Sequence, residues 1–289
     1  MRRSILIPLI GFALIATTTL VVVARSAFVS AKSMPLIDRI LYDQPTPPIP
    51  EPAAAIASGA SSTLPQSAVV PIIVYHIVRP SYPSDDAAVR ALAVTPETFA
   101  AQLAHLQSAG YQTISFDDLE RYFRTGAPLP PKPVIISFDD GWGDQFQYAF
   151  PVLQQYKDTA TFFVFTNSIG HKGFMTWDDL RELAASGMSI GDHTKSHPFL
   201  TKIVNPAKLW DEINGSKIIL QEQLGIQVTT FAYPFGQYND AIISTLRAAG
   251  FEGARGDYWN GDTQTPDKLY GMSAMNAPTS TEKFIKQYP

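Results

Sequence analysis

The sequence predicts an α/β domain built on a parallel sheet, arranged either as a barrel or as a doubly wound sheet. Strand-like and helix-like segments alternate almost throughout the chain from about residue 69 onward, which is the pattern of repeated βα units. The strand-like segments are apolar without polar alternation, as expected for strands covered on both faces. Carboxylates and histidines follow several of these segments, and functional side chains gather where parallel strands end.

The composition supports one sizeable globular domain with appendages. The 289 residues are 45% hydrophobic and 17% charged, which excludes disorder throughout the chain. The formal net charge is −4 and the basic residues form no long run, so we expect no nucleic-acid partner. The absence of cysteine excludes disulfides and thiolate metal sites.

Residues 1–30 predict a membrane anchor. Two arginines precede an uncharged apolar run from Ile5 to Ala24, and Arg25 follows it. About 20 such residues can cross a bilayer as a helix, and the flanking positive charges favour a cytoplasmic N-terminus. We therefore expect a single-pass cell-membrane protein whose main domain lies outside the cytoplasm. Cleavage near the small residues Val29-Ser30-Ala31 would instead release a secreted protein.

Residues 31–68 predict a linker, and residues 69–289 predict the globular domain. Proline, alanine and serine dominate the stretch from about Gln44 to Ser67. Such a composition cannot bury a core and forms a semi-extended tether.

The first half of the globular domain predicts three strands and two helices. Thr95 before Pro96 is typical of a helix N-terminus, and the stretch SFDD (115–118) resembles a capping box. The expected strands are 71–78, 111–114 and 133–138, and the expected helices run from Pro96 to Gly110 and from Ser115 to Gly126.

The second half continues the alternation. Pro151 is expected to bend or interrupt a helix, and the stretch TWDD (176–179) is another capping box. The expected strands are 159–166, the short run 188–191 and 228–232, and the expected helices are 145–156, 177–187, 206–224 and 239–249.

The strand-like run Pro133–Phe138 is central because it ends in two adjacent carboxylates, Asp139 and Asp140, followed by Gly141. Two neighbouring carboxylates repel each other unless a cation or a shared proton neutralises one of them. The stretch therefore predicts a strand end that delivers acid to a site, with partners elsewhere in the chain.

His193 and His197 are candidate partners of these carboxylates. They lie four residues apart after another strand-like run, a spacing that lets two imidazoles reach one ion. A histidine pair at this spacing is more often solvent-facing or hydrogen-bonded structure than a ligand set. Agreement between the two strand ends favours the metal interpretation, because two histidines and one aspartate make an open site for a divalent metal.

The stretches SFDDG (137–141) and HTKSHP (193–198) resemble the first two motifs of the polysaccharide deacetylases, the NodB-homology enzymes of carbohydrate esterase family 4. The resemblance covers the chain from Val69 onward and implies a distorted (β/α) barrel, usually with seven strands. An apolar strand that ends in Tyr75-His76 precedes the first motif, which is similar to the secreted poly-N-acetylglucosamine deacetylases.

The resemblance implies a role for each motif residue. Asp139 matches the general base, whereas Asp140, His193 and His197 match the ligands of a divalent metal. Zinc (Zn2+) is the metal expected by default, with Co2+, Ni2+ or Fe2+ as alternatives. A metal that acidifies water, beside a carboxylate that accepts its proton, suits hydrolysis of an acetamide. Ser196 is interpreted as a loop-fixing hydrogen-bond partner, since no base for it is evident.

The stretch FAYPFG (231–236) resembles the third family motif. The resemblance implies that the backbone N–H of Phe235 faces the oxyanion and that side chains near Tyr233 form one wall of a groove. Ala232 stands where many members carry an arginine that orients the base, so another group must position Asp139. Arg255 lies in the region of the fourth motif, whose pattern is not clearly present, and we assign it no role.

His76 is our hypothesis for the general acid. Most family members carry a late Leu-x-His motif for this role, and no histidine follows His197 here. In the poly-N-acetylglucosamine relatives the early Tyr-His strand supplies the acid, which implies that His76 protonates the leaving amine. Without that resemblance, a single histidine at a strand end is more often structural.

These observations predict a membrane-anchored, metal-dependent deacetylase of N-acetylglucosamine polysaccharide. The expected substrates, in order, are poly-N-acetylglucosamine, peptidoglycan and chitin-like oligomers. One alternative is a non-catalytic surface glycan-binding protein, which the missing arginine at position 232 favours and the complete set of Asp139 and metal ligands opposes. The other is a deacetylase of a small amide or ester, which predicts a closed pocket.

Overall fold

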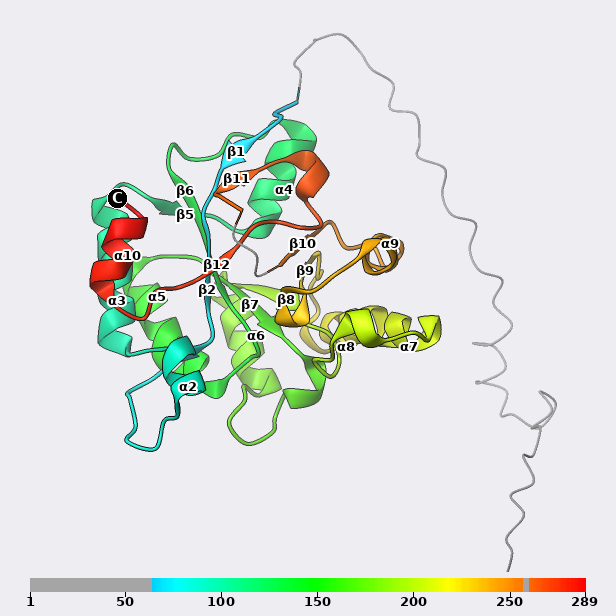
Figure 1. The fold of residues 1–289 in the computed structure, drawn as a ribbon, viewed down its shortest axis with the longest axis horizontal. Coiled ribbons are helices and arrows are strands. Elements are labelled where there is room, and N and C mark those ends of the chain that lie inside the picture. The colour runs from blue at the N-terminus through cyan, green and yellow to red at the C-terminus, as the bar shows by residue number, and fades with distance from the viewer. Residues whose placement is uncertain (1–63, 257–259) are drawn as a thin grey trace, which may run out of the picture. The chain divides into compact units, whose positions relative to one another are not determined.

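In the computed structural model, which describes residues 64–256 and 260–289, a curled parallel sheet is surrounded by helices (Figure 1). Seven strands follow one another in the order β10-β9-β8-β7-β6-β2-β12, and all neighbours on this path are parallel. These strands are β2 Ile72–Tyr75, β6 Pro133–Phe138, β7 Thr161–Val164, β8 Ser189–Asp192, β9 Thr230–Ala232, β10 Gly253–Arg255 and β12 Met275–Asn276. Strand β5 (Gln112–Thr113) pairs with the start of β6 outside this path.

The sheet is a half-barrel. The predicted α/β class and the seven parallel strands are confirmed, but the barrel is open instead of closed. Within the described residues β10 and β12 do not pair with each other, and an isolated bridge between Arg255 and Met272 links β10 to the segment before β12. The two edge strands are three and two residues long, so they offer few backbone groups for closing the sheet.

The helix starts predicted from the sequence are present. The Thr95 side chain accepts a hydrogen bond from the backbone of Thr98 at the start of α3 (Pro96–Ser108). Ser115 and Thr176 open complete capping boxes at α4 (Phe116–Thr125) and α6 (Trp177–Ala185). The other α-helices in the described part of the chain are α2 Ala87–Leu92, α5 Phe150–Tyr156, α7 Pro206–Trp210, α8 Ser216–Leu224, α9 Asp240–Ala248 and α10 Thr281–Gln287.

Two of the expected long helices contain π-helical turns. The turn Gln145–Ala149 precedes α5, where Pro151 lacks the N–H that an α-helical hydrogen bond would need. The turn Asp211–Gly215 separates α7 from α8. Such turns change the direction of side chains within a helix, and the second one carries Glu212 to the candidate site described below.

The first expected strand is also interrupted. His76 separates β2 from β3 (Ile77–Val78), and β3 pairs with β4 (Ala93–Val94) instead of with the main sheet. A further short pair joins β1 (Ala68–Val69) to β11 (Thr263–Gln264). Helices α2 and α10 and strands β1, β3, β4, β10, β11 and β12 were not expected from the sequence as separate elements, because each is short and lacks a periodic pattern.

The predicted anchor, residues 1–30, and residues 31–63 of the predicted linker lie outside the described residues. Among residues 64–256 and 260–289, no helix combines the length and the apolar character needed to span a bilayer.

Candidate metal centre and active site

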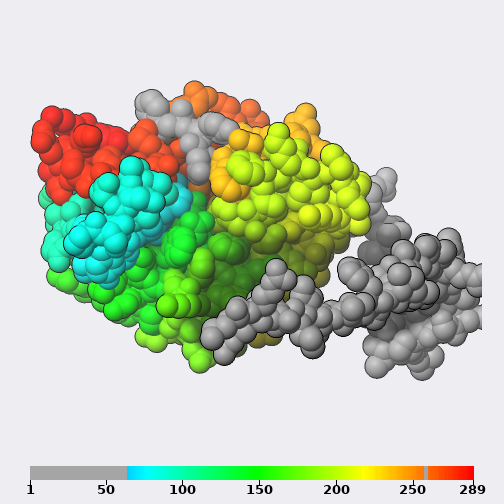
Figure 2. Space-filling view, turned by 60° about the horizontal axis from the view of Figure 1, so that its bottom comes forward, coloured from blue at the N-terminus to red at the C-terminus, as the bar shows by residue number. Residues whose placement is uncertain are grey.

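The predicted site residues lie at one edge of the sheet. Asp139 and Asp140 follow β6, His193 follows β8, Phe235 follows β9 and His76 follows β2. Because these strands are parallel, their carboxyl ends share that edge. Figure 2 turns this side of the molecule toward the reader, with residues around 80–95 in cyan and residues around 200–215 in yellow-green on its two sides.

Asp140, His193 and His197 come together as a triad. The Nε2 atoms of the two histidines are 3.1 Å apart, and Asp140 Oδ1 lies 3.7 Å from His193 Nε2 and 3.4 Å from His197 Nε2. All three ligand atoms could hold one metal ion. The structure therefore brings together the three residues that the sequence predicts as ligands.

The local contacts prepare His193 to act as a ligand. Its Nδ1 atom lies 2.8 Å from the carbonyl oxygen of Ala232, so Nδ1 carries the proton and Nε2 keeps its lone pair toward the triad. Burial, together with the neighbouring His197, lowers the pKa of His193 well below its ordinary value. The ring is therefore neutral at physiological pH, which is the form that binds a metal.

The backbone around the site adopts a conformation that is rare outside glycine. Asp140, Thr194, His197 and Phe235 have φ values of 74°, 74°, 55° and 58°, and they are four of the five non-glycine residues with positive φ in the described part of the chain. Strain of this kind collects at functional sites, where the surroundings enforce it. Gly141 follows with φ 75°, and a Cβ atom there would lie 2.9 Å from Val164 Cγ1.

The loop that carries the two histidines is held by hydrogen bonds on both sides. The backbone N–H of Thr194 donates to Asp192 Oδ1 at 2.7 Å, and that of His197 donates to Thr194 Oγ1 at 2.9 Å. Ser196 Oγ donates to Glu212 Oε1 at 2.6 Å from the π-helical turn. Ser196 thus has the structural contact that the loop-fixing interpretation predicts.

Asp139 is 2% exposed and lies between Arg255 and His76. The Arg255 guanidinium forms an ion pair with Asp139 Oδ1, and His76 Nε2 lies 3.8 Å from Asp139 Oδ2. The arginine stabilises the ionised carboxylate inside the domain, which is the form that a general base needs.

Arg255 is the residue that sequence reasoning missed. In the parallel register of β9 and β10, Arg255 is the partner of Ala232. The guanidinium therefore reaches the base from the strand beside the position where many family members carry theirs. The position of Arg255 in the region of the fourth motif was a signal for it, but only the strand register shows that its side chain can replace an arginine at 232.

Tyr233 does not itself form a wall of the site, but the nearby Phe235 exposes its side chain there. Tyr233 is fully buried and its hydroxyl donates to the carbonyl oxygen of Tyr270 at 2.8 Å, so its side chain does not line a groove. Phe235 is 45% exposed instead, with its ring centroid 4.7 Å from that of His197. Trp142 Nε1 donates to Asp140 Oδ2 at 3.0 Å, which fixes the ligand carboxylate and gives this tryptophan a role that the sequence did not reveal.

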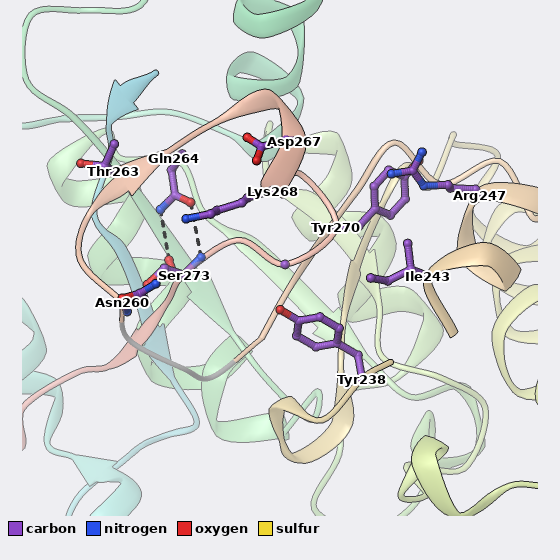
Figure 3. Close-up of a pocket in the computed structure, with 11 residues that line it drawn as sticks. Tyr238, Ile243, Arg247, Asn260, Thr263, Gln264, Asp267, Lys268, Tyr270 and Ser273 are labelled. Atoms are coloured by element: carbon purple, nitrogen blue, oxygen red, sulfur yellow. Dashed lines mark hydrogen bonds between the residues drawn. The ribbon is translucent and has the colours of Figure 1, made fainter. Parts of the chain in front are cut away.

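A separate cavity of about 300 Å³ lies between α9 and the segment that contains β11 (Figure 3). Tyr238, Arg247, Lys268 and Tyr270 are among its lining residues. None of the predicted catalytic or metal-binding residues lines this cavity, so we do not assign the reaction to it.

Comparison with known proteins agrees with the geometry. Residues 126–254 match the family model for polysaccharide deacetylase. YxkH of Bacillus subtilis, a protein provisionally named a polysaccharide deacetylase, is 31% identical over 185 residues, which cover 64% of this chain and 63% of that protein. The poly-β-1,6-N-acetyl-D-glucosamine N-deacetylase of Staphylococcus aureus is 26% identical over 172 residues, which cover 55% of this chain and 59% of that protein. The match thus spans less than two thirds of the length of these two relatives.

A solved structure shares the fold. The Streptococcus pyogenes deacetylase PplD, determined in complex with acetate, superposes with a TM-score of 0.70 at 25% identity, covering 76% of this chain and 98% of PplD. The region that matches the family contains Asp139, the triad and Phe235, and Arg255 follows it directly. Residues 126–254 therefore resemble a polysaccharide deacetylase domain in sequence, and the fold resembles that of the deacetylase PplD.

Proposed function

We propose that this domain removes N-acetyl groups from an N-acetylglucosamine polysaccharide in a metal-dependent reaction. The observation that carries the proposal is the buried Asp139. It directly precedes Asp140, the first residue of the triad, and is ion-paired with Arg255. The name of the Staphylococcus aureus relative supports poly-β-1,6-N-acetylglucosamine as the first substrate to test. Peptidoglycan and chitin-like oligomers come second and third.

The triad fits a tetrahedral metal site. Tetrahedral bonds of about 2.0–2.1 Å place neighbouring ligand atoms about 3.3 Å apart, and the three measured separations are 3.1, 3.4 and 3.7 Å. Three protein ligands leave a position open, as in catalytic zinc sites. A divalent metal held by these residues would polarise the acetamide carbonyl and acidify a water molecule. Zinc is the first candidate, and Co2+, Ni2+ and Fe2+ suit the same donor set.

The chain's own residues supply the proton transfers. We assign to Asp139 the proton of the attacking water, because Arg255 keeps its carboxylate ionised and fixed. The backbone N–H of Phe235 is assigned to the developing oxyanion. His76, beside the second oxygen of Asp139, is assigned the proton that the departing amine requires. After these transfers the products are acetate and a free amino sugar.

The ion pair between Arg255 and Asp139 weakens the alternative of a non-catalytic glycan-binding protein. That alternative depended on the missing arginine at position 232, and Arg255 brings a guanidinium to Asp139 from the adjacent strand. A binding protein has no need of a buried, ion-paired base beside three ligand atoms.

The test is release of acetate from acetylated β-1,6-glucosamine oligomers by the purified chain. The protein is stripped of metal with a chelator and reconstituted with single divalent ions, and Asp139→Asn serves as the control. We expect activity to disappear on chelation and to return with the metal, and Asp139→Asn to reduce kcat by about 10²- to 10⁴-fold. Acetate release no higher than that of the Asp139→Asn control, with every metal and substrate, would refute the enzymatic proposal.

We also propose that residues 1–30 anchor the protein in the cell membrane, with the domain outside the cytoplasm. The apolar run from Ile5 to Ala24 between arginines supports this, and so does a polymer substrate too large to enter the cell. Protease added to intact cells should remove the domain, and carbonate washing should leave the N-terminal segment in the membrane fraction. Recovery of the intact chain in the culture medium would favour secretion instead.

A further inference from the structure

Two exposed phenylalanines lie stacked next to the metal-ligand triad. The ring centroids of Phe199 and Phe235 are 3.8 Å apart at an interplanar angle of 11°, and the residues are 43% and 45% exposed. Each directly follows a proline in sequence. Side chains that fill a core are buried, so this pair is not explained by packing.

The stack is held in a fixed position. Thr201 Oγ1 donates to Gln237 Oε1 at 3.2 Å and connects the segments that carry the two rings, and the neighbouring Leu200 is 1% exposed and anchors the first segment in the core. Phe235 keeps the rare positive φ of 58°, and its ring approaches that of His197 at 4.7 Å. The surroundings thus maintain a strained backbone in order to present an apolar surface to water, which favours a binding role.

We infer that Phe199 binds the sugar ring that precedes or follows the N-acetylglucosamine being deacetylated. This inference rests on the proposed function, because it takes the reacting acetamide to lie at the triad. Phe199 stacks on Phe235, and the Phe235 ring in turn approaches that of His197, so we assign Phe199 to a neighbouring sugar of the same chain. The pyranose of β-linked N-acetylglucosamine is neutral and exposes C–H groups on its faces, which match an aromatic ring without any charged partner.

The consequence is a preference for oligomers over short substrates. A dimer has only one neighbouring sugar beside the reacting unit, so it contacts Phe199 only when that sugar lies on the side of the stack. A reacting unit inside a hexamer has a neighbouring sugar on each side, so one of them can always contact Phe199. The stack therefore indicates that the substrate of this site is a glycan chain and not a small amide or ester.

The test compares kcat/KM for acetate release from β-1,6-linked N-acetylglucosamine dimers and hexamers. We expect Phe199→Ala to lower the ratio of hexamer to dimer kcat/KM by roughly three- to tenfold, the size of an aromatic stacking contact. Phe199→Trp should preserve the ratio. Ile285→Ala, which removes an equally exposed (43%) apolar side chain on α10, is the matched control and should leave it unchanged. An unchanged ratio in Phe199→Ala, or an equal loss on dimer and hexamer, would overturn the inference.

A binding measurement separates this inference from the proposed function. Hexamer affinity is measured by calorimetry in the Asp139→Asn variant, with and without Phe199→Ala. If no variant releases acetate, the proposed function fails, while a three- to tenfold weaker affinity of the double variant still supports the sugar contact. Equal affinity of the two proteins would overturn the contact whether or not the wild-type chain is an enzyme.

Discussion

Two carboxyl groups are buried at different places in this domain, and they differ in whether a cation pairs with them. Asp139 follows the carboxyl end of β6, is 2% exposed and is ion-paired with Arg255. Glu120 lies on α4, is 0% exposed and accepts a hydrogen bond from Thr230 Oγ1 at 3.4 Å. Its Oε2 atom has no hydrogen-bond partner among residues 64–256 and 260–289. Burial, followed by the nearby Asp117 and Glu252, raises the pKa of Glu120 to about 9.

Residues at the two ends of strand β10 lie against the two carboxyl groups and give them different surroundings. Its last residue, Arg255, pairs with Asp139. Its first residue is Gly253, where a Cβ atom would lie 2.3 Å from Glu120 Oε1, so glycine leaves the space that Glu120 occupies. Burial alone favours the neutral acid. The two sites thus differ because Arg255 forms an ion pair with the buried Asp139, whereas burial favours the protonated form of Glu120 at neutral pH.

The largest expected effect comes from removing the cation. In Arg255→Met, Asp139 loses the charge that stabilises its ionised form, so we expect kcat/KM to fall by about 100-fold or more. The free energy of unfolding should also fall by about 3–5 kcal/mol, because the buried Asp139 loses its ion-pair partner.

Arg255→Lys and Arg181→Met serve as comparisons. Lysine keeps the positive charge and should recover part of the lost kcat/KM. Arg181 forms an exposed ion pair with Asp178, so its replacement should change neither rate nor stability measurably. Equal kcat/KM in Arg255→Met and the wild type would show that Arg255 does not control the base.

The second prediction concerns the neutral acid. The pKa of Glu120 is raised on folding, so its contribution to stability is complete below the pKa of the unfolded chain, near 4.5, and is lost as pH rises through about 9. At the limiting slope of about 1.4 kcal/mol per pH unit, the loss between pH 5 and 8 is at most about 4 kcal/mol. Glu120→Gln cannot ionise and should remove this slope.

Urea unfolding at pH 5, 6, 7 and 8 measures the slope directly. Glu282→Gln is the matched control, because Glu282 is exposed in an ion pair with Lys286 on α10, and it should keep the wild-type slope. The assignment would be wrong if Glu120→Gln and the wild type lost stability in parallel over this range.

The smallest expected effect concerns Asp140, whose carboxylate is 19% exposed and is fixed by a neutral donor instead of a cation. Trp142→Phe removes the indole N–H but keeps an aromatic ring against Phe174, on which Trp142 stacks at 4.4 Å. Loss of a hydrogen bond that orients a ligand should weaken metal affinity by about tenfold. Calorimetric titration with zinc measures this, with Trp177→Phe on α6 as the control. Unchanged affinity would mean that the histidines alone orient the metal.

The sequence determined the features that depend on neighbouring residues. Thr95-Pro96 and the two capping boxes predict helix starts because a cap acts on the backbone within about three residues, and the structure confirms them. The acidic pair after the apolar run 133–138 predicts a strand end that carries chemistry, since a parallel strand can place side chains only at its ends. Two histidines four residues apart could likewise be recognised as a pair from spacing.

The tertiary structure decided the features that depend on register and burial between distant segments. Arg255 meets Asp139 across 116 residues of sequence because β10 aligns it with Ala232. The stack of Phe199 and Phe235 and the burial of Glu120 likewise follow from packing between segments far apart in the chain. A residue pattern records local preference, but the charge of a buried carboxylate depends on which group lies against it, and that is fixed only when the sheet assembles.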